Sequence, residues 1–202
     1  MSSFNKKPSI VYWLGNSVYL NITNRCSNRC CFCVRQFKDG LNGFILNLQK
    51  EPSATEVTEE LAKVLPRKNW DEVVFCGFGE PLQRLDVVLK VTKWIKKNHP
   101  TTTVRVNTNG QGYLLNKGRD VISELKAAGV DKVNVSLNAQ DKQTYNKICK
   151  PVFDDAYESI LEFIEKAKKV METEATAVTV PEVDLAKVKE LAKTMGVKFR
   201  AR

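Results

Sequence analysis

The chain of 202 residues lacks the signatures of several common protein classes. It has a single histidine, His99, no Ser/His/Asp arrangement and no phosphate loop of the Gly-Lys-Ser/Thr type, so hydrolase and NTPase functions lose support. No apolar run approaches the roughly 20 residues of a membrane span. The segment Met1 to Pro8 is polar and lacks the apolar stretch of a signal peptide. We therefore expect a cytoplasmic protein with no membrane association and with reduced cysteines.

The composition also lacks any sign of a second domain. There is no Pro- or Ser-rich linker, no low-complexity tract and no break in composition along the chain. Charged residues make up 27% and hydrophobic residues 43% of the chain, which is typical of a globular protein. A chain of this length can bury a sizeable core. We predict one domain that spans residues 1–202.

Apolar runs with strand character alternate with helical patterns along nearly the whole chain. This alternation predicts parallel strands joined by right-handed crossovers. Six such units in 202 residues fall short of the roughly 250 residues of an eight-fold barrel. We therefore predict an α/β fold, a partial, open (β/α)6 barrel of the TIM type, preceded by an N-terminal hairpin around Gly15-Asn16. The predicted strands are Val18–Ile22, Glu72–Cys76, Thr103–Val106, Lys132–Leu137, Glu174–Val180 and Val197–Phe199. The predicted helices start at the capping box Ser53-Ala54-Thr55-Glu56 and cover about Leu85–Asn98, Val121–Ala128, Asp155–Met171 and Leu185–Met195.

Three of the six cysteines, Cys26, Cys30 and Cys33, follow the first predicted strand at a C-x3-C-x2-C spacing. Thiolates are the usual ligands of iron–sulfur clusters, and a cubane held by three of them leaves one iron free to bind a substrate or cofactor. Short cysteine clusters are also typical of zinc sites, which need a fourth ligand. No Cys or His outside the loop stands at a C-x2-C or C-x2-H spacing, and this favours the open cluster.

The run from Asn24 to Cys33 resembles the cluster loop of the radical S-adenosylmethionine (SAM) superfamily, and the aromatic Phe32 just before the last cysteine fits that pattern. The resemblance selects Cys30 rather than Cys31 as a ligand, so Cys31 is expected to be a small buried or half-buried thiol. The resemblance to the superfamily covers residues 16–180. Three segments, residues 12–17, 77–81 and 107–112, look in particular like the small TatD-associated radical SAM proteins. The superfamily resemblance implies a 4Fe-4S cluster on Cys26, Cys30 and Cys33, with SAM bound beside Phe32. The partial barrel is also the core fold of that family.

Functional groups gather at the carboxyl ends of strands in parallel β/α folds. The second predicted strand is followed by Gly77-Phe78-Gly79-Glu80-Pro81, which resembles the family's Gly-Gly-Glu motif with Phe78 in place of the first glycine. The resemblance implies that Gly79 and Glu80 bind the amino group of SAM, because glycine allows a close approach and a carboxylate accepts from an ammonium. An ordinary turn between strand and helix is the structural alternative.

The next two strand ends supply further polar groups. Asn107 and Asn109 lie in a turn that the family places near the cofactor or substrate, although an Asx-type turn would need the same residues. Ser136 and Asn138 match positions that face the ribose of SAM, and Asn138 stands where Asp is frequent. Arg105 would face the barrel interior and need an anion there, for which the SAM carboxylate is a candidate.

The resemblance implies an enzyme that reductively cleaves SAM to methionine and a 5'-deoxyadenosyl radical, which takes hydrogen from a substrate that the sequence does not identify. No cysteine-rich extension for an auxiliary cluster follows the sixth strand. The candidate substrates are a nucleotide, a tRNA or a protein, and an activase that installs a glycyl radical on a partner is an alternative. Outside enzymes, the alternative is a zinc-dependent nucleic-acid-binding module. Residues 36–52 are a candidate lid.

The chain has a net charge of +9, and four basic residues surround the cysteines: Arg25, Arg29, Arg35 and Lys38. Such a patch attracts acidic partners. We expect an acidic electron donor of the flavodoxin or ferredoxin type to bind there, with a phosphorylated substrate or a nucleic acid as alternatives. A solvated surface is the simpler interpretation of the excess charge over the whole chain.

Overall fold

A computed structural model describes residues 7–202. The strands are β1 (Val11–Leu14), β2 (Ser17–Leu20), β3 (Gly40–Leu41), β4 (Phe44–Ile45), β5 (Glu72–Phe75), β6 (Thr103–Thr108), β7 (Lys132–Ser136), β8 (Glu172–Ala177) and β9 (Lys198–Ala201). The α-helices are α1 (Ala54–Val64), α2 (Leu85–Asn98), α3 (Gly112–Leu115), α4 (Val121–Ala128), α5 (Lys142–Cys149), α6 (Ala156–Ala167) and α7 (Leu185–Thr194). Short 3-10 helices are η1 (Val34–Gln36), η2 (Leu65–Arg67) and η3 (Pro81–Arg84).

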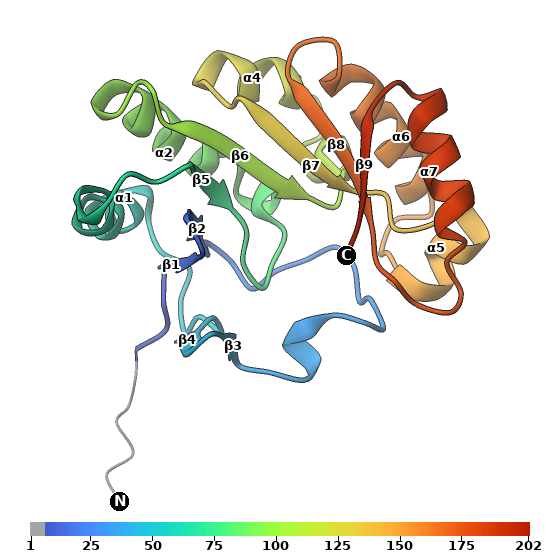
Figure 1. Cartoon of the computed structure of the whole chain (residues 1–202), viewed down its shortest axis with the longest axis horizontal. Helices are drawn as coiled ribbons and strands as arrows, with labels where there is room; N and C mark the ends of the chain where they lie inside the picture. The colour runs from blue at the N-terminus through green and yellow to red at the C-terminus, as the bar shows by residue number, and fades with distance from the viewer. Residues whose placement is uncertain (1–6) are drawn as a thin grey trace, which may run out of the picture.

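One sheet of seven strands forms the centre of the fold, in the order β1-β2-β5-β6-β7-β8-β9. The strands from β2 to β9 in this order pair in parallel, and β1 pairs with β2 in an antiparallel hairpin. Among the described residues the two outer strands do not pair, so the barrel is open. The predicted six-unit α/β fold with an N-terminal hairpin is confirmed. Figure 1 shows the strands side by side with the long helices on one side of the sheet.

Local sequence signals set several helix ends. Ser53 and Glu56 form the predicted capping box at the start of α1, with the Glu56 backbone N–H donating to the Ser53 hydroxyl at 3.1 Å. Helix α4 ends at Gly129, which has a φ of 103°. This left-handed conformation is open to glycine at little cost and lets the chain turn directly into β7.

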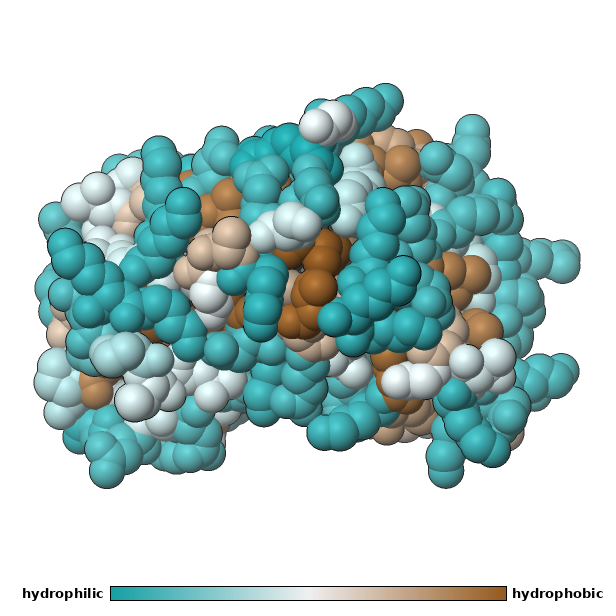
Figure 2. Space-filling model, turned by 90° about the horizontal axis from the view of Figure 1, so that it is seen from above, coloured by the Kyte–Doolittle hydropathy of each residue, from teal (hydrophilic) through white to brown (hydrophobic). Residues whose placement is uncertain are grey.

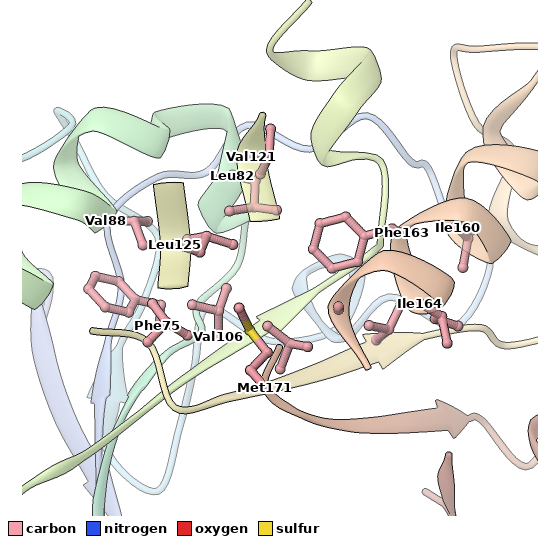
Figure 3. Packing of buried hydrophobic residues seen from close by; sticks show 14 of the residues in the cluster. Phe75, Leu82, Val88, Val106, Val121, Leu125, Ile160, Phe163, Ile164 and Met171 are labelled. Carbon is pink, nitrogen blue, oxygen red and sulfur yellow. The ribbon is translucent and has the colours of Figure 1, made fainter. Parts of the chain in front are cut away.

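The main hydrophobic core fills the space between the sheet and the helices. Val73 and Phe75 of β5 and Val106 of β6 point toward the helices and are fully buried. Figure 3 shows Phe75 and Val106 with Leu125 of α4 and Phe163 of α6 in the same cluster. Because side chains alternate along a strand, the residues between them point to the opposite side of the sheet, here called the open face.

Two segments differ from the sequence expectation. Helix α5 was not predicted, because it is short and polar and its strongest signal is the Asp141 side chain, which accepts a hydrogen bond from the Thr144 backbone N–H. The candidate lid, residues 36–52, contains the small β3-β4 hairpin. Leu46 is buried there in a second apolar cluster with Tyr12 and Phe78, so this segment is anchored on the N-terminal hairpin.

The surface seen in Figure 2 is predominantly hydrophilic, with hydrophobic residues visible mainly near its centre. Among residues 7–202, no helix combines the length and apolar character needed to cross a membrane.

Candidate active site

The cysteine loop, residues 23–33, leaves the carboxyl end of β2 and packs against the end of α5. Backbone hydrogen bonds join the two segments: Arg29 donates to the Cys149 carbonyl and Cys31 to the Ile148 carbonyl, both at 2.9 Å. A further bond from the Val152 N–H to the Ser27 carbonyl, also 2.9 Å, extends the contact. The unpredicted helix α5 is therefore the support on which the loop rests.

A buried network of side-chain hydrogen bonds joins the loop to α5 and to the segment after β6. Asn28 donates to the Tyr145 hydroxyl at 2.8 Å, and Gln111 donates to both the Asn28 amide oxygen (2.8 Å) and the Tyr145 hydroxyl (3.0 Å). All three side chains are buried. Sequence reasoning missed them as site residues, although Asn28 lies between two predicted ligands. The network holds the part of the loop that carries Cys26 and Cys30.

The predicted ligands Cys26, Cys30 and Cys33 are all half-buried, and Phe32 packs partly buried against the main core. Burial and the charge of Glu80 raise the pKa of Cys26 to about 12. A hydrogen bond with Cys149 and burial raise the pKa of Cys30. Both thiols are therefore protonated in the free protein, and ligation must displace their protons.

Cys31 is exposed, and the expectation that it is buried or half-buried was wrong. Its backbone N–H is bound to α5, so the loop path keeps this residue at the surface while its neighbours Cys30 and Phe32 face inward.

Glu80 lies at the turn after β5, and only 3% of it is exposed. Its carboxylate accepts hydrogen bonds from the Leu82 N–H (3.0 Å), the Thr108 hydroxyl (2.8 Å) and the Asn109 N–H (2.6 Å). These hydrogen bonds favour the charged form, but burial has the larger effect and raises the pKa of Glu80 above its ordinary value. The carboxylate thus ties the turn after β5 to the turn after β6.

Gly79 brings the same turn against the cysteine loop. A Cβ atom at this position would lie 2.5 Å from the carbonyl oxygens of Thr23 and Arg25, which is closer than real contacts allow. The adjacent Glu80 N–H donates to the Arg25 carbonyl at 2.8 Å. Glycine is required here by the close approach of two backbones.

Asn109 completes the link between three strand ends. Its side-chain amide donates to the Ser27 hydroxyl at 2.9 Å and lies 3.9 Å from the Cys26 sulfur. The structure therefore brings together the cysteine loop, Glu80 and Asn109 in one continuous site.

The remaining predicted SAM contacts lie further along the sheet. The Asn107 amide oxygen accepts from Arg105 at 3.0 Å, and the Ser136 hydroxyl accepts from Arg202 at 3.0 Å. Asn138 has a φ of 61° and donates to the Cys149 sulfur at 3.6 Å. Its Oδ1 atom is buried without a hydrogen-bond partner among the described residues, and a ligand hydroxyl would satisfy it.

The anion that Arg105 needs is provided by the protein. Its Nε donates to the Glu72 carboxylate at 2.8 Å, so the SAM carboxylate is not required to neutralise it. This pair belongs to the open face, where Glu174 also pairs with Arg200 at 3.1 Å. The charged side chains of β5 to β9 line a cavity of about 310 Å³. A parallel sheet usually buries apolar residues on both faces, so this polar face is suited to water or a polar ligand.

The basic patch is smaller than the sequence suggests. Arg25 pairs with Glu51 at 2.7 Å, and Arg35 donates to the Asn24 carbonyl at 2.8 Å. Arg29 and Lys38 remain exposed. They are accompanied by two exposed apolar side chains, Val34 (37%) and Phe37 (70%).

Two inorganic groups are candidates for binding by the thiols of the loop, a zinc ion and a 4Fe-4S cluster. Within residues 7–202, no three Cys, His, Asp or Glu side chains are placed to hold a single metal ion. Zinc binds such ligands within about 2.0–2.3 Å of one centre, so the zinc alternative has no support in the described geometry. A 4Fe-4S cubane is larger, and its thiolate ligands stand further apart. Three half-buried thiols on residues 26–33 suit it by number and softness.

Comparisons with known proteins establish the family. The model of the Radical SAM superfamily matches residues 20–195, and the chain belongs to this superfamily of enzymes, which use a 4Fe-4S cluster and SAM. Similar curated proteins include a GTP 3',8-cyclase of Paenarthrobacter nicotinovorans, 33% identical over 67% of this chain and 35% of that protein. A GTP 3',8-cyclase of Aliarcobacter butzleri (strain RM4018) is 31% identical over 90% of this chain and 53% of that protein. The chain thus spans between a third and about half of these relatives.

Solved structures agree with the fold. The structure of TYW1 with a lysine-pyruvate adduct bound has a TM-score of 0.64 at 20% identity, over 93% of this chain and 65% of that one. Methylornithine synthase (PylB) also gives a TM-score of 0.64, at 14% identity, over 92% of this chain and 52% of that one. The narrower resemblance to TatD-associated proteins stays a prediction.

Proposed function

We propose that this protein reductively cleaves SAM at a 4Fe-4S cluster held by Cys26, Cys30 and Cys33, and that the resulting 5'-deoxyadenosyl radical acts on a substrate. The observation that carries the proposal is the set of hydrogen bonds by which Asn109 joins Glu80 to the cysteine loop. These residues come from three separate strand ends, which is where parallel β/α enzymes place their chemistry.

Each proposed residue has a task that follows from its position. The three thiolates hold the cluster, which when bound supplies the electron for SAM cleavage. Glu80 orders the turn beside the loop, so that Gly79 and Asn109 present polar groups to the SAM methionine. Asn107, Ser136 and Asn138 are proposed to bind SAM further along the strand ends, with the vacant Oδ1 of Asn138 accepting from a ribose hydroxyl. Phe32 packs beside the ligands and limits access of water.

The substrate is proposed to be a nucleotide rather than a tRNA or a protein. The relatives named for GTP 3',8-cyclase chemistry favour this substrate class. An acidic flavodoxin or ferredoxin is proposed as the electron donor.

The experiment that tests this function is anaerobic reconstitution with iron and sulfide, followed by reaction with SAM and a strong reductant. We expect about four irons per chain, and slow release of 5'-deoxyadenosine and methionine. Replacing Cys26, Cys30 or Cys33 by Ala should abolish both, whereas Cys31→Ala should preserve both. Binding of zinc alone, or a full cluster in Cys30→Ala with loss in Cys31→Ala, would contradict the proposed ligand set.

A further inference from the structure

Three basic residues, Lys198, Arg200 and Arg202, alternate along β9, the outer strand of the sheet. Because alternate residues of a strand share a face, all three belong to the open face. The Arg202 N–H donates to the Ala177 carbonyl at 2.8 Å, and the Arg202 carbonyl accepts from the Thr179 N–H at 2.9 Å. These bonds continue the pairing of β9 with β8 (Figure 1). Arg202 therefore stands at the carboxyl end of the sheet, where the candidate site lies.

Arg202 differs from the other basic side chains that β6 to β9 present on the open face, because each of the others has an acidic partner. The ion pairs are Arg105–Glu72, Lys132–Glu172, Lys198–Glu172 and Arg200–Glu174. No acidic side chain within residues 7–202 forms an ion pair with Arg202. The excess positive charge of this face is thus located at the carboxyl ends of the strands.

The guanidinium of Arg202 lies over the end of β7. One terminal nitrogen donates to the Ser136 hydroxyl at 3.0 Å, and within residues 7–202 this is the only hydrogen bond of the Arg202 side chain. A guanidinium carries five N–H donors in a planar fork. Arg202 is exposed, so the remaining donors are accessible to a ligand. The anchored fork suits a phosphate or a carboxylate, which it can bind through two parallel hydrogen bonds.

The place of the guanidinium favours an anion of the substrate over the carboxylate of SAM. Gly79 and Glu80, the proposed contacts of the SAM methionine, follow β5, which is two strands away from β7. Neighbouring strands are about 4.8 Å apart, so this separation is about 10 Å. Arg202 approaches Ser136 from the opposite side, that of β9. The guanidinium therefore lies beyond the proposed ribose contact, where a second molecule would bind next to SAM.

We propose that Arg202 binds a phosphate group of the nucleotide substrate and that Ser136 orients its guanidinium. The inference rests on the proposed function, which places SAM at the strand ends and makes a nucleotide the substrate. The Ser136 hydroxyl accepts from Arg202 and can still donate to the ribose of SAM, so one side chain contacts both ligands. Because a nucleoside offers no anion to the fork, Arg202 selects the phosphorylated form.

The test measures binding of GTP and of guanosine to the reconstituted protein with SAM present, by anaerobic calorimetry. We expect wild type to bind GTP more tightly than guanosine. Arg202→Gln should weaken GTP binding about tenfold, because it loses a charge-assisted contact, and should leave guanosine binding unchanged. Arg202→Lys keeps the charge without the fork and should give an intermediate GTP affinity. Arg200→Gln is the matched control, because Glu174 already neutralises Arg200, and its GTP affinity should equal that of wild type.

Equal GTP affinity in wild type and Arg202→Gln would overturn the inference. A loss of SAM affinity in Arg202→Gln at unchanged GTP affinity would also overturn it, since the anion would then be the carboxylate of SAM. So would the absence of GTP binding by a wild type that cleaves SAM. Failure of the wild type to assemble a cluster or to cleave SAM would instead refute the proposed function, so the failures are distinguishable.

Denaturant unfolding checks that the variants fold. Arg202→Gln retains the backbone bonds to β8, and its amide can still donate to Ser136, so its free energy of unfolding should be close to that of wild type. If Arg202→Gln does not fold, Arg202→Lys supplies the comparison, and a GTP affinity equal to that of wild type in Arg202→Lys would then refute binding by the guanidinium fork.

Discussion

The carboxylate of Glu80 and the backbone N–H of Asn109 are joined by a hydrogen bond of 2.6 Å between the turns that follow β5 and β6. Glu80 uses one oxygen for Asn109 and the other for Leu82 and Thr108. Among the described residues, Oε2 accepts only from Asn109 and keeps a lone pair for one further donor. The contribution of Glu80 to SAM binding is therefore expected to come from this remaining acceptor site and from the order that Glu80 gives to Asn109 and Gly79.

Glu80→Ala should destabilise the protein and weaken SAM binding while leaving the cluster in place. Three buried donors lose their acceptor, and each unsatisfied group costs about 1–3 kcal/mol. Glu80→Gln is the matched variant, because an amide oxygen can still accept from Leu82 and Thr108 while its NH2 group opposes the Asn109 N–H. We expect smaller destabilisation in Glu80→Gln but a clear loss of SAM affinity, measured by denaturant unfolding and anaerobic calorimetry. Unchanged SAM affinity in both variants would remove Glu80 from the site.

Tyr145→Phe should loosen the cysteine loop from within the core. The variant removes the hydroxyl that accepts from Asn28 and Gln111, at a cost of about 1–3 kcal/mol for the buried donors left unpaired. Iron retention during gel filtration should fall, because Asn28 lies between two ligands. Tyr157→Phe is the control: it loses one buried hydrogen bond, to the Ala139 carbonyl, away from the loop. Equal iron retention in the two variants would contradict the role of Tyr145.

The Glu72–Arg105 pair should make stability depend on pH in the acid range. Burial raises the pKa of Glu72, but hydrogen bonds and charge from Arg105 outweigh it, so the pKa lies below its usual value. The stabilisation is present above the unfolded pKa of about 4.3 and is lost as the pH falls through the lower folded value.

Glu72→Gln should remove this pH dependence and leave Arg105 without its anion. We expect a loss of about 2–3 kcal/mol near neutral pH, below the range for fully buried pairs because solvent reaches both side chains. The control is Glu172→Gln, an exposed partner of Lys132 and Lys198, with little effect expected. Denaturant unfolding between pH 3 and 7 measures both. A wild-type curve no steeper in acid than that of Glu72→Gln would disprove the assignment.

Reduction by an acidic flavodoxin or ferredoxin should slow as ionic strength rises, because Arg29 and Lys38 attract the donor over a distance that salt shortens. The double variant Arg29→Ser/Lys38→Ser should reduce both the rate and its salt dependence. Phe37→Ser should slow reduction without changing the salt dependence, since it removes an apolar contact.

The control for donor docking is the same charge change on the helical side, Lys93→Ser/Lys97→Ser on α2. SAM cleavage with dithionite should be unchanged in all these variants. Stopped-flow reduction that ignores both salt and the Arg29 and Lys38 substitutions would show that the donor binds elsewhere.

The sequence predicted those features that depend on local pattern. All six parallel strands were placed within a few residues, because each is a short apolar run between helical segments, and Ser53 and Gly129 marked helix ends by their own chemistry. The residues at the strand ends were found for the same reason. Side-chain contacts between strands were not predicted, because a pair such as Arg105 and Glu72 depends on the register of the sheet. The backbone hydrogen bonds from Arg29 and Cys31 to Cys149 and Ile148 were also not predicted, because they depend on the unpredicted helix α5.

The close approach at Gly79 has a consequence for how such a site can change over time or be rebuilt by design. With only 2.5 Å from a would-be Cβ to the Thr23 and Arg25 carbonyl oxygens, a side chain at this position requires a new path for the cysteine loop. Transplanting the cysteine segment alone onto another barrel would therefore omit the glycine turn against which the segment packs. The glycine turn, though remote in sequence, has to be grafted with it as one unit.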